Sequence, residues 1–159
     1  MRWPPTTAAT PATSLWSNDF TPVHQVRTRL HEPGMCQLGF GLPAAMALQL
    51  LHPGRPVFNI TGDGSFGFTV NELDTARRHG LPVVTVVHNN AAWGIIARGQ
   101  RKQFGFELGS GLEGTDPAAI ARGFGCHGET VRHADALGPG AGPRLGVGPA
   151  GGAGLPYPV

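Results

Sequence analysis

The sequence predicts an α/β domain with a parallel sheet flanked by helices, and three neighbouring segments carry this prediction. VFNIT (57–61) is a short apolar stretch typical of a strand. TVNELDTARRHG (69–80) has the features of a helix, with Arg77 and Arg78 in its last turn and Gly80 as a stop signal. PVVTVVHNN (82–90) is a nearly continuous β-branched run, typical of a strand buried on both faces of a parallel sheet. Together they form a strand–helix–strand unit of about 30 residues.

Further elements are expected on both sides of this unit. LPAAMALQLLH (42–52) predicts a helix that is rich in alanine and leucine, with Pro43 in its first turn. Residues 93–104 are compatible with another helix. Asp116 followed by Pro117 predicts the capped start of a helix through AAIARGFG, and GETV (128–131) predicts one more strand. We therefore place one domain at residues 31–135.

The two ends of the chain have a different composition. Residues 1–30 begin with an aperiodic Pro/Thr/Ala-rich stretch and predict a flexible N-terminal segment. Residues 136–159 form a Gly/Pro-rich tail in which Arg144 is the only formally charged side chain after Gly138. Two interpretations of this tail stay open. It is a disordered tail, or a frameshift has replaced the last helix and strand and left the fold incomplete at the C-terminus.

Charge and cysteine content exclude several classes of function. Lys and Arg number 12 against 10 Asp and Glu, and no basic stripe with interleaved aromatics is present, so no nucleic-acid partner is expected. We find no signal peptide and no apolar run long enough to span a bilayer, which predicts a cytoplasmic protein without membrane contact. Cys36 and Cys126 form no metal-binding or disulfide motif. Cys126 is expected to be a small buried residue.

The stretch ITGDGSFG (60–67) has the Gly-x-Gly-x-x-Gly spacing of a dinucleotide-binding turn. A dinucleotide fold, however, needs an acidic residue at the end of its second strand, and here that strand ends in His88-Asn89-Asn90. Asp63, inside the glycine turn, would repel a pyrophosphate unless a metal ion lay between them. The turn therefore favours a metal–phosphate site over a bare dinucleotide.

Two polar residues are expected to meet at one edge of the sheet. Asp63 ends the first strand and Asn90 ends the next, so parallel pairing places both at the same edge. Carboxylate and amide oxygens are hard ligands suited to Mg²⁺ or Ca²⁺. The backbone N–H groups of Gly64 and Ser65 are placed to face a phosphate.

At this point the sequence resembles a known family. GDGSF followed at this spacing by NN is similar to the diphosphate-binding signature of thiamine diphosphate-dependent enzymes. LGFGLPAAMALQL and ELDTARRHGLPVVTVVHNNAAWG resemble the matching segments of the acetolactate synthase and benzaldehyde lyase branch. The resemblance covers roughly residues 31–135 and implies the thiamine diphosphate-binding fold.

The resemblance also implies roles for individual residues. Asp63, Asn90 and the main-chain carbonyl of Ala92 would be ligands of Mg²⁺. A bulky apolar residue, here Leu38, would hold thiamine diphosphate in its bent shape, and the loop at Cys36 would offer a carbonyl to the aminopyrimidine. The residues expected to contact the diphosphate are Gly62, Gly64 and Ser65.

Some residues remain open between a functional and a structural interpretation. Glu72 is expected to be a helix-start carboxylate rather than a catalytic acid, and His79 an exposed residue at a helix end. His88 is a weaker candidate for the lining of the site. Trp93 fits either a substrate pocket or core packing.

The family implies that the catalytic glutamate comes from a separate pyrimidine-binding domain, and that the active site lies between two subunits. We find no counterpart of that glutamate in this sequence, so no catalytic residue is assigned. The expected function is a thiamine diphosphate- and Mg²⁺-binding part of a carboligase or decarboxylase for small 2-oxo acids or aldehydes. It would need a pyrimidine-binding domain or partner subunit, would form an oligomer if functional, and would bind cofactor weakly or not at all alone. The alternatives are a non-catalytic remnant of such an enzyme and, more distantly, a dinucleotide-binding reductase module.

Overall fold

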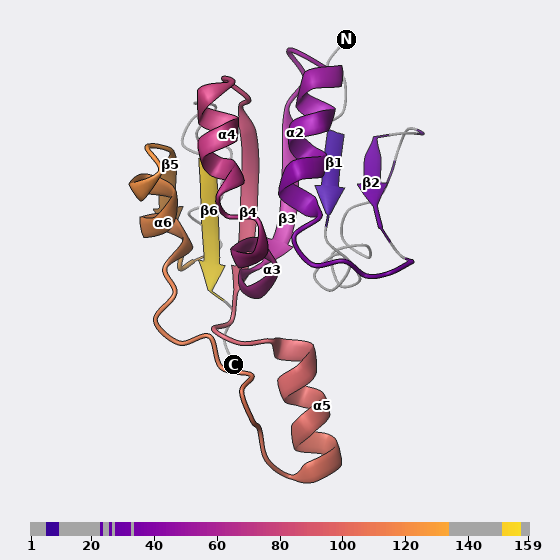
Figure 1. Cartoon of the computed structure of the whole chain (residues 1–159), viewed down its shortest axis with the longest axis vertical. Helices are drawn as coiled ribbons and strands as arrows, with labels where there is room; N and C mark the ends of the chain where they lie inside the picture. Colours follow the sequence, from indigo (N-terminus) through magenta and orange to yellow (C-terminus); the bar gives the residue numbers. More distant parts are fainter. Residues whose placement is uncertain are drawn as a thin grey trace.

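The computed structural model describes residues 6–9, 23, 26, 28–32, 34–133 and 151–156, which form a parallel sheet with helices (Figure 1). The strands found in these ranges lie in the order β2-β1-β3-β4-β6-β5, and every neighbouring pair is parallel. The strands are β1 (Thr6–Ala9), β2 (Arg29–His31), β3 (Val57–Gly62), β4 (Val83–Asn89), β5 (His127–Thr130) and β6 (Gly151–Pro156). The helices are α2 (Gly41–Leu51), α3 (Asp63–Phe68), α4 (Glu72–Arg78), α5 (Gly94–Phe104) and α6 (Pro117–Gly123).

The central strand–helix–strand unit is confirmed. β3 and β4 are neighbours, and their register pairs Val57 with Val83 and Gly62 with His88. Both strands therefore end at the same edge of the sheet, as the sequence predicted. The start of α6 is also confirmed, because Asp116 Oδ1 accepts hydrogen bonds from the main-chain nitrogens of residues 118 and 119 at 2.9 and 3.0 Å.

The stretch after β3 differs from the prediction, because it is helical from Asp63 onward. Gly64 and Gly67 lie inside α3, although each glycine in a helix costs about 1 kcal/mol relative to alanine. Phe66, only 3% exposed, packs into the core from this helix, and that burial outweighs the low helix propensity of the glycines. The predicted helix over 69–80 is correspondingly shortened to α4.

Besides the short β2, two strands, β1 and β6, lie in terminal segments where the sequence pattern predicted none. β1 pairs with β2 and β3, and β6 lies between β4 and β5. Main-chain hydrogen bonds to neighbouring strands hold both of them in the sheet. Such bonds do not require a periodic pattern of apolar residues, so the sequence carried no sign of these strands. Most of segments 1–30 and 136–159 falls outside the described residues, so the flexibility of the first and the frameshift in the second stay predictions.

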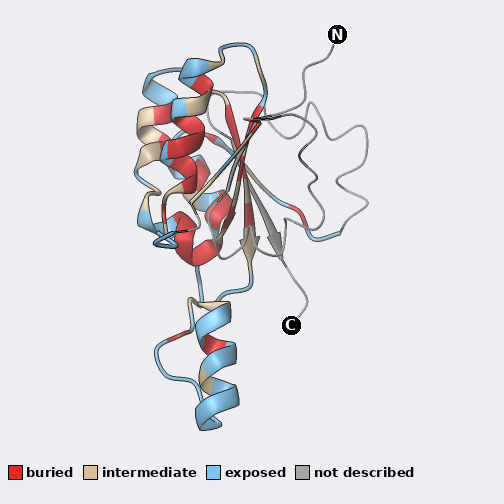
Figure 2. Ribbon diagram, turned by 90° about the vertical axis from the view of Figure 1, so that its right-hand side faces the viewer, coloured by how far each residue is buried: buried red, intermediate tan, exposed pale blue. Residues whose placement is uncertain are grey.

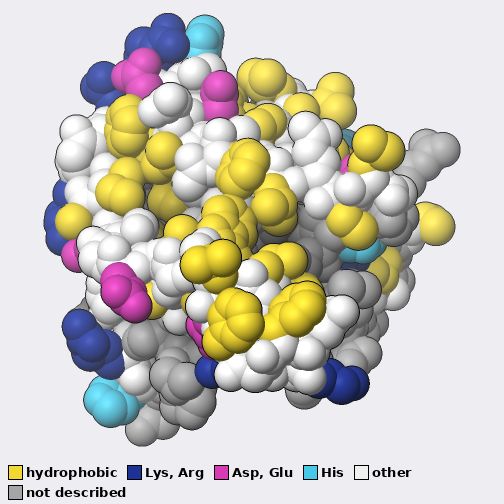
Figure 3. All heavy atoms as spheres, turned by 60° about the horizontal axis from the view of Figure 1, so that its bottom comes forward, with side chains coloured by type: hydrophobic (Ala, Val, Ile, Leu, Met, Phe, Trp, Pro, Cys, Tyr) yellow, Lys and Arg dark blue, Asp and Glu magenta, His cyan; other side chains and the backbone are white. Residues whose placement is uncertain are grey.

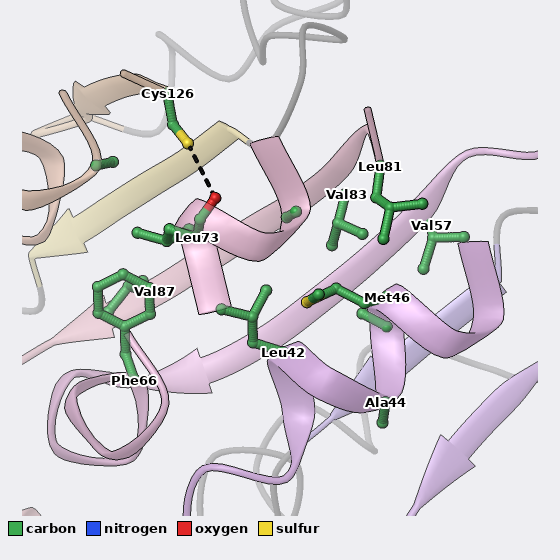
Figure 4. Packing of buried hydrophobic residues seen from close by; sticks show 13 residues of the cluster. Leu42, Ala44, Met46, Val57, Phe66, Leu73, Leu81, Val83, Val87 and Cys126 are labelled. Atoms are coloured by element: carbon green, nitrogen blue, oxygen red, sulfur yellow. Dashed lines mark hydrogen bonds between the residues drawn. The ribbon is translucent and has the colours of Figure 1, made fainter. Parts of the chain in front are cut away.

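The core lies between one face of the sheet and the helices α2 and α4 (Figures 2 and 4). Figure 4 shows Met46 of α2 beside Val57 and Val83 of the sheet, with Leu73 of α4 nearby. Cys126 is buried, and its Sγ donates to the carbonyl oxygen of Leu73 at 3.8 Å, so its predicted place in the interior is confirmed. In the described part of the chain, no helix is both long and apolar enough to cross a membrane.

Helix α5 projects beyond the edge at which β3 and β4 end (Figure 1). Its only fully buried residue is Ala97, so most of the helix surface faces away from the sheet. Residues 105–112 return from the tip of α5 towards the sheet, and α5 with this return segment is called the arm below.

Candidate cofactor and metal site

Asp63 lies directly after β3 and is almost fully buried, with 5% of its surface exposed. Its Oδ1 accepts a hydrogen bond from the main-chain nitrogen of Gly64 at 3.0 Å, whereas its Oδ2 is buried and has no hydrogen-bond partner. Burial raises the pKa of Asp63, and the nearby amides of Gly64 and Ala92 lower that pKa by less. A buried carboxylate oxygen without a partner is unfavourable, and a bound cation is the kind of group that would offset this.

The loop after β4 carries two asparagines with different partners. Asn89 uses both ends of its side chain within the fold, because Oδ1 accepts from Ala91 N at 3.0 Å and Nδ2 donates to Thr115 O at 3.3 Å. Asn90 is exposed, and its Oδ1 accepts from Ala92 N at 3.3 Å. Ala91, between them, has a left-handed backbone with φ of 55°, an unfavourable conformation for a residue with a Cβ.

Ala92 is held from one side by the return segment of the arm. Leu112 N donates to Ala91 O at 2.7 Å, and Trp93 N donates to Ser110 O at 2.8 Å. These two bonds flank Ala92 in an antiparallel bridge, so its own N–H and C=O point away from the return segment. The Ala92 amide lies near Asp63, and the Ala92 carbonyl therefore faces the same side as that carboxylate.

Gly64 does not leave open space at the site. A Cβ at this position would lie 2.3 Å from the Trp93 ring, which packs directly over the glycine. Trp93 also makes an edge-on contact with Phe68, with ring centroids 5.9 Å apart. The glycine is thus required by the tryptophan ring, a role that the spacing of glycines did not reveal.

The loop that carries Leu38 is fastened to α3 and the turn after it. Gly39 N donates to Ser65 Oγ at 2.9 Å, and Thr69 Oγ1 donates to Gly39 O at 2.9 Å. Leu38, which is partly exposed, is consequently held beside the helix that begins with Asp63. Ser65 fixes this loop through its lone pairs, and its hydroxyl proton is still able to donate to a ligand.

Cys36 lies farther out on the same loop, exposed and with a φ of 51°. The loop is closed by Glu32, whose carboxylate accepts from Met35 N at 2.9 Å and Gln37 N at 3.0 Å. The Gln37 amide and then the Met35 amide lower the pKa of Glu32. Glu32 thus shapes the loop.

The remaining candidates are placed as follows. Glu72 is the first residue of α4 and His79 is exposed at its end, as expected. His88 is half-buried in β4 opposite Gly62, and burial lowers its pKa.

The structure brings the predicted metal ligands together around one main-chain amide. Ala92 N donates to Asn90, and the same amide lies near Asp63. Sequence reasoning missed three residues that hold this arrangement. Gly39 and Thr69 fasten the Leu38 loop, and a Cβ at Gly94 would lie 2.5 Å from Asn90 Nδ2. The single signal in the sequence was the glycine content of the GFG and WG segments.

Comparison with known proteins now decides the family. The model of the thiamine pyrophosphate enzymes' C-terminal TPP-binding domain matches residues 11–141, which is most of the chain. The chain belongs to the thiamine pyrophosphate enzymes. Thiamine pyrophosphate is the same compound as thiamine diphosphate, so the predicted family and cofactor are confirmed. The match also begins upstream of residue 31, where the resemblance was first placed.

Individual relatives are consistent with this family. The chain is 39% identical over 99 residues to a 2-hydroxyacyl-CoA lyase 2 of Caenorhabditis elegans, covering 62% of this chain and 16% of the relative. It is 31% identical over 124 residues to an acetolactate synthase of Bacillus subtilis (strain 168), covering 78% of this chain and 22% of the relative. This thiamine pyrophosphate enzyme domain therefore matches only about a fifth of the length of these relatives.

A solved structure confirms the fold. The thiamine diphosphate-dependent 4-hydroxybenzoylformate decarboxylase of Rhodococcus jostii RHA1 superposes with a TM-score of 0.79 at 26% identity. The match covers 94% of this chain and 29% of that structure. The parallel sheet with helices is therefore the fold of the thiamine pyrophosphate enzymes.

Proposed function

We propose that this chain provides the diphosphate- and metal-binding half of an acetolactate synthase-like carboligase or decarboxylase. The observation that carries the proposal is the buried Oδ2 of Asp63, which has no hydrogen-bond partner and lies at the edge where β3 and β4 end. A divalent cation such as Mg²⁺ fits this donor set, because it prefers oxygen ligands and offsets the buried negative charge.

The metal ligands are proposed to be Asp63, Asn90 and the main-chain carbonyl of Ala92. Asp63 supplies the charge, and the bridge to the return segment turns the Ala92 carbonyl to the same side. Asn90 exchanges its hydrogen bond from Ala92 N for a bond to the metal, which its exposed position permits. The Asn89 side chain is excluded from this role because the fold uses both of its ends.

Thiamine diphosphate, when bound, would supply carbanion chemistry at the carbonyl carbon of the substrate. The chain's own residues bind and orient it in this proposal. Ser65, whose Oγ accepts from Gly39 N, would donate its hydroxyl proton to the diphosphate, and Leu38 would support the cofactor through shape and dispersion. Gly62 is proposed to contact the diphosphate, and the loop at Cys36 would offer a main-chain carbonyl to the aminopyrimidine. Gly64 is also proposed to contact the diphosphate; its amide donates to Asp63 and its Cα is covered by the ring of Trp93.

A second domain is proposed to complete the site. Large apolar side chains are exposed around the edge that carries Asp63, and Figure 3 shows hydrophobic side chains gathered on that face. Phe68 is 63% exposed, and Ile95 and Ile96 at the start of α5 are more than half exposed. Apolar surface of this kind favours coverage by another domain or subunit. We therefore infer that a pyrimidine-binding domain, or a partner subunit in an oligomer, packs here and supplies the catalytic glutamate.

The substrate is proposed to be a small 2-oxo acid or aldehyde. Support comes from the relatives, which include acetolactate synthases and a 4-hydroxybenzoylformate decarboxylase, although the chain matches only part of each. We also propose a cytoplasmic location, because the exposed Cys36 and the buried Cys126 form no disulfide.

The proposal that another domain or subunit supplies the catalytic glutamate is tested by assaying this chain with pyruvate or benzaldehyde, thiamine diphosphate and Mg²⁺. The expected result is no turnover above a protein-free control, because the group that activates the pyrimidine ring is not assigned to any residue of this chain. Turnover that disappears in Asp63→Ala would show that the chain supplies its own substitute for that glutamate. A non-catalytic remnant differs in remaining inactive when a pyrimidine-binding domain from an acetolactate synthase-like enzyme is added.

A further inference from the structure

The arm is held together by polar contacts rather than by a core of its own. α5 buries only Ala97 fully, and Ile95, Ile96 and Phe104 are more than half exposed. The ring of Phe104 contacts that of Phe106 in the return segment, but both rings stay exposed. An exposed ion pair joins Arg101 to Glu107, at 2.6 Å, but exposed pairs contribute little to stability. Something else must fix the return segment on the helix.

Gln100 makes that connection. Its Nε2 donates to Leu108 O at 3.0 Å, and its Oε1 accepts from Leu108 N at 3.2 Å, so one amide side chain satisfies both main-chain groups of that residue. Ser110 Oγ donates to the same Oε1 at 3.1 Å. Ser110 is only 2% exposed, which makes it a buried polar residue in an otherwise exposed arm. The two bonds to Leu108 are exposed, whereas the bond to Ser110 is partly buried. Because a buried hydroxyl is costly to leave without a partner, the bond between Ser110 and Gln100 favours one geometry of the return segment.

The same return segment fixes the loop that carries the proposed metal ligand. Ser110 O accepts from Trp93 N, and Leu112 N donates to Ala91 O. These bonds hold Ala91 in its unfavourable left-handed conformation and turn the carbonyl of Ala92 towards Asp63. A chain of contacts thus leads from the side chain of Gln100, in the middle of α5, to the edge of the sheet.

We propose that Gln100 is a positioning residue for the metal site, acting through Ser110 and the return segment on the carbonyl of Ala92. The inference rests on the proposed function, since it assigns no new ligand and concerns the geometry of the same site. Outer residues that orient metal ligands typically change metal affinity by about 10–100-fold when they are replaced. Replacing Gln100 is expected to lower the affinity by a factor near the lower end of this range, because its amide is two contacts away from the Ala92 carbonyl and a third from the metal.

The test compares Gln100→Leu with Gln103→Leu in the full chain. Gln103 lies in the same helix and is exposed. Both variants replace a glutamine of α5 by leucine, but Gln100→Leu removes the bonds to Leu108 and Ser110. Amide hydrogen exchange is followed by NMR at Trp93 and Leu112 without any ligand. The apparent dissociation constant of Mg²⁺ is then measured by NMR titration at saturating thiamine diphosphate. In Gln100→Leu, both amides are expected to exchange faster and the constant to rise about tenfold. Gln103→Leu is expected to match the wild type in both measurements.

Gln100→Glu separates positioning from a general loosening of the arm. Its carboxylate still accepts from Leu108 N and Ser110 Oγ but no longer donates to Leu108 O, so we expect Mg²⁺ affinity between those of wild type and Gln100→Leu. If hydrogen exchange at Trp93 and Leu112 is unchanged in Gln100→Leu, then Gln100 does not fix the return segment, whether or not ligand binds. If exchange is faster but Mg²⁺ affinity is unchanged, then Gln100 fixes the return segment without positioning the metal site. Absence of Mg²⁺-dependent binding by the wild type, even when a pyrimidine-binding domain from an acetolactate synthase-like enzyme is added, instead overturns the proposed function, and the inference with it.

Discussion

Replacing Gly39 by alanine tests how tightly the Leu38 loop is fastened to α3. Gly39 has a φ of 84°, and a Cβ there would lie 2.8 Å from Phe68 Cβ and 3.0 Å from Thr69 Cγ2. The left-handed conformation alone costs an alanine about 1–2 kcal/mol. Overpacking against neighbours that cannot move freely adds about 1–3 kcal/mol. We therefore expect Gly39→Ala to lower the free energy of unfolding by about 3 kcal/mol.

Gly54→Ala is the matched control for this change. Gly54 has nearly the same φ, 82°, but nothing lies within 4 Å of the position its Cβ would take. This variant is expected to lose only the backbone contribution, about 1–2 kcal/mol. Urea unfolding of both variants, followed by tryptophan fluorescence, gives the two free energies. Equal losses in the two variants would refute the contact of Gly39 with α3, and with it the fastening of the loop that carries Leu38.

Two further outcomes follow from burial at the edge of the sheet and in the core. Because burial raises the pKa of Asp63 in the folded state, the metal-free chain loses stability as pH rises from the unfolded-state pKa through the raised folded-state pKa. Asp63→Asn should therefore be more stable than wild type in EDTA at pH 7 and no more stable at low pH, as thermal unfolding would show; a less stable variant at pH 7 contradicts the argument. Cys36 is exposed whereas burial raises the pKa of the Cys126 thiol, so iodoacetamide should modify Cys36 first and Cys126 only on unfolding; equal rates in mass spectra would speak against this.

The central part of the fold could be predicted from the sequence because its signals are local. The β-branched run of β4 and the cap formed by Asp116 before Pro117 depend on residues within a few positions of each other. β1 and β6 gave no such signal, since strands in a parallel sheet are joined by main-chain bonds to segments far away in the sequence. The start of α3 at Asp63 was missed for a related reason, because tertiary burial of Phe66 overrides the low helix propensity of glycine.

In the candidate site, too, some residues could be predicted from the sequence and others could not. Asp63 and Asn90 could be chosen from sequence because consecutive parallel strands end at one edge, and the register of β3 with β4 bears out that reasoning. The structure gives a reason for Gly64 that the glycine spacing did not reveal, since the ring of Trp93 fills the space that the absence of a side chain leaves. No sequence pattern indicated Gln100, because its hydrogen bonds are made to a return segment whose path is set by tertiary contacts.

The most direct test of the account is whether thiamine diphosphate binding depends on Mg²⁺ and on the carboxylate of Asp63. The ¹⁵N-labelled chain is titrated with thiamine diphosphate in Mg²⁺ or EDTA, and wild type is compared with Asp63→Asn, whose side chain has the same shape without the charge. We expect weak, saturable shifts at the amides of Gly64, Ser65 and Ala92, present only in wild type with Mg²⁺. Shifts of equal size in EDTA or in Asp63→Asn would contradict the proposed site, as would no shifts in the wild type with Mg²⁺ even after a pyrimidine-binding domain from an acetolactate synthase-like enzyme is added.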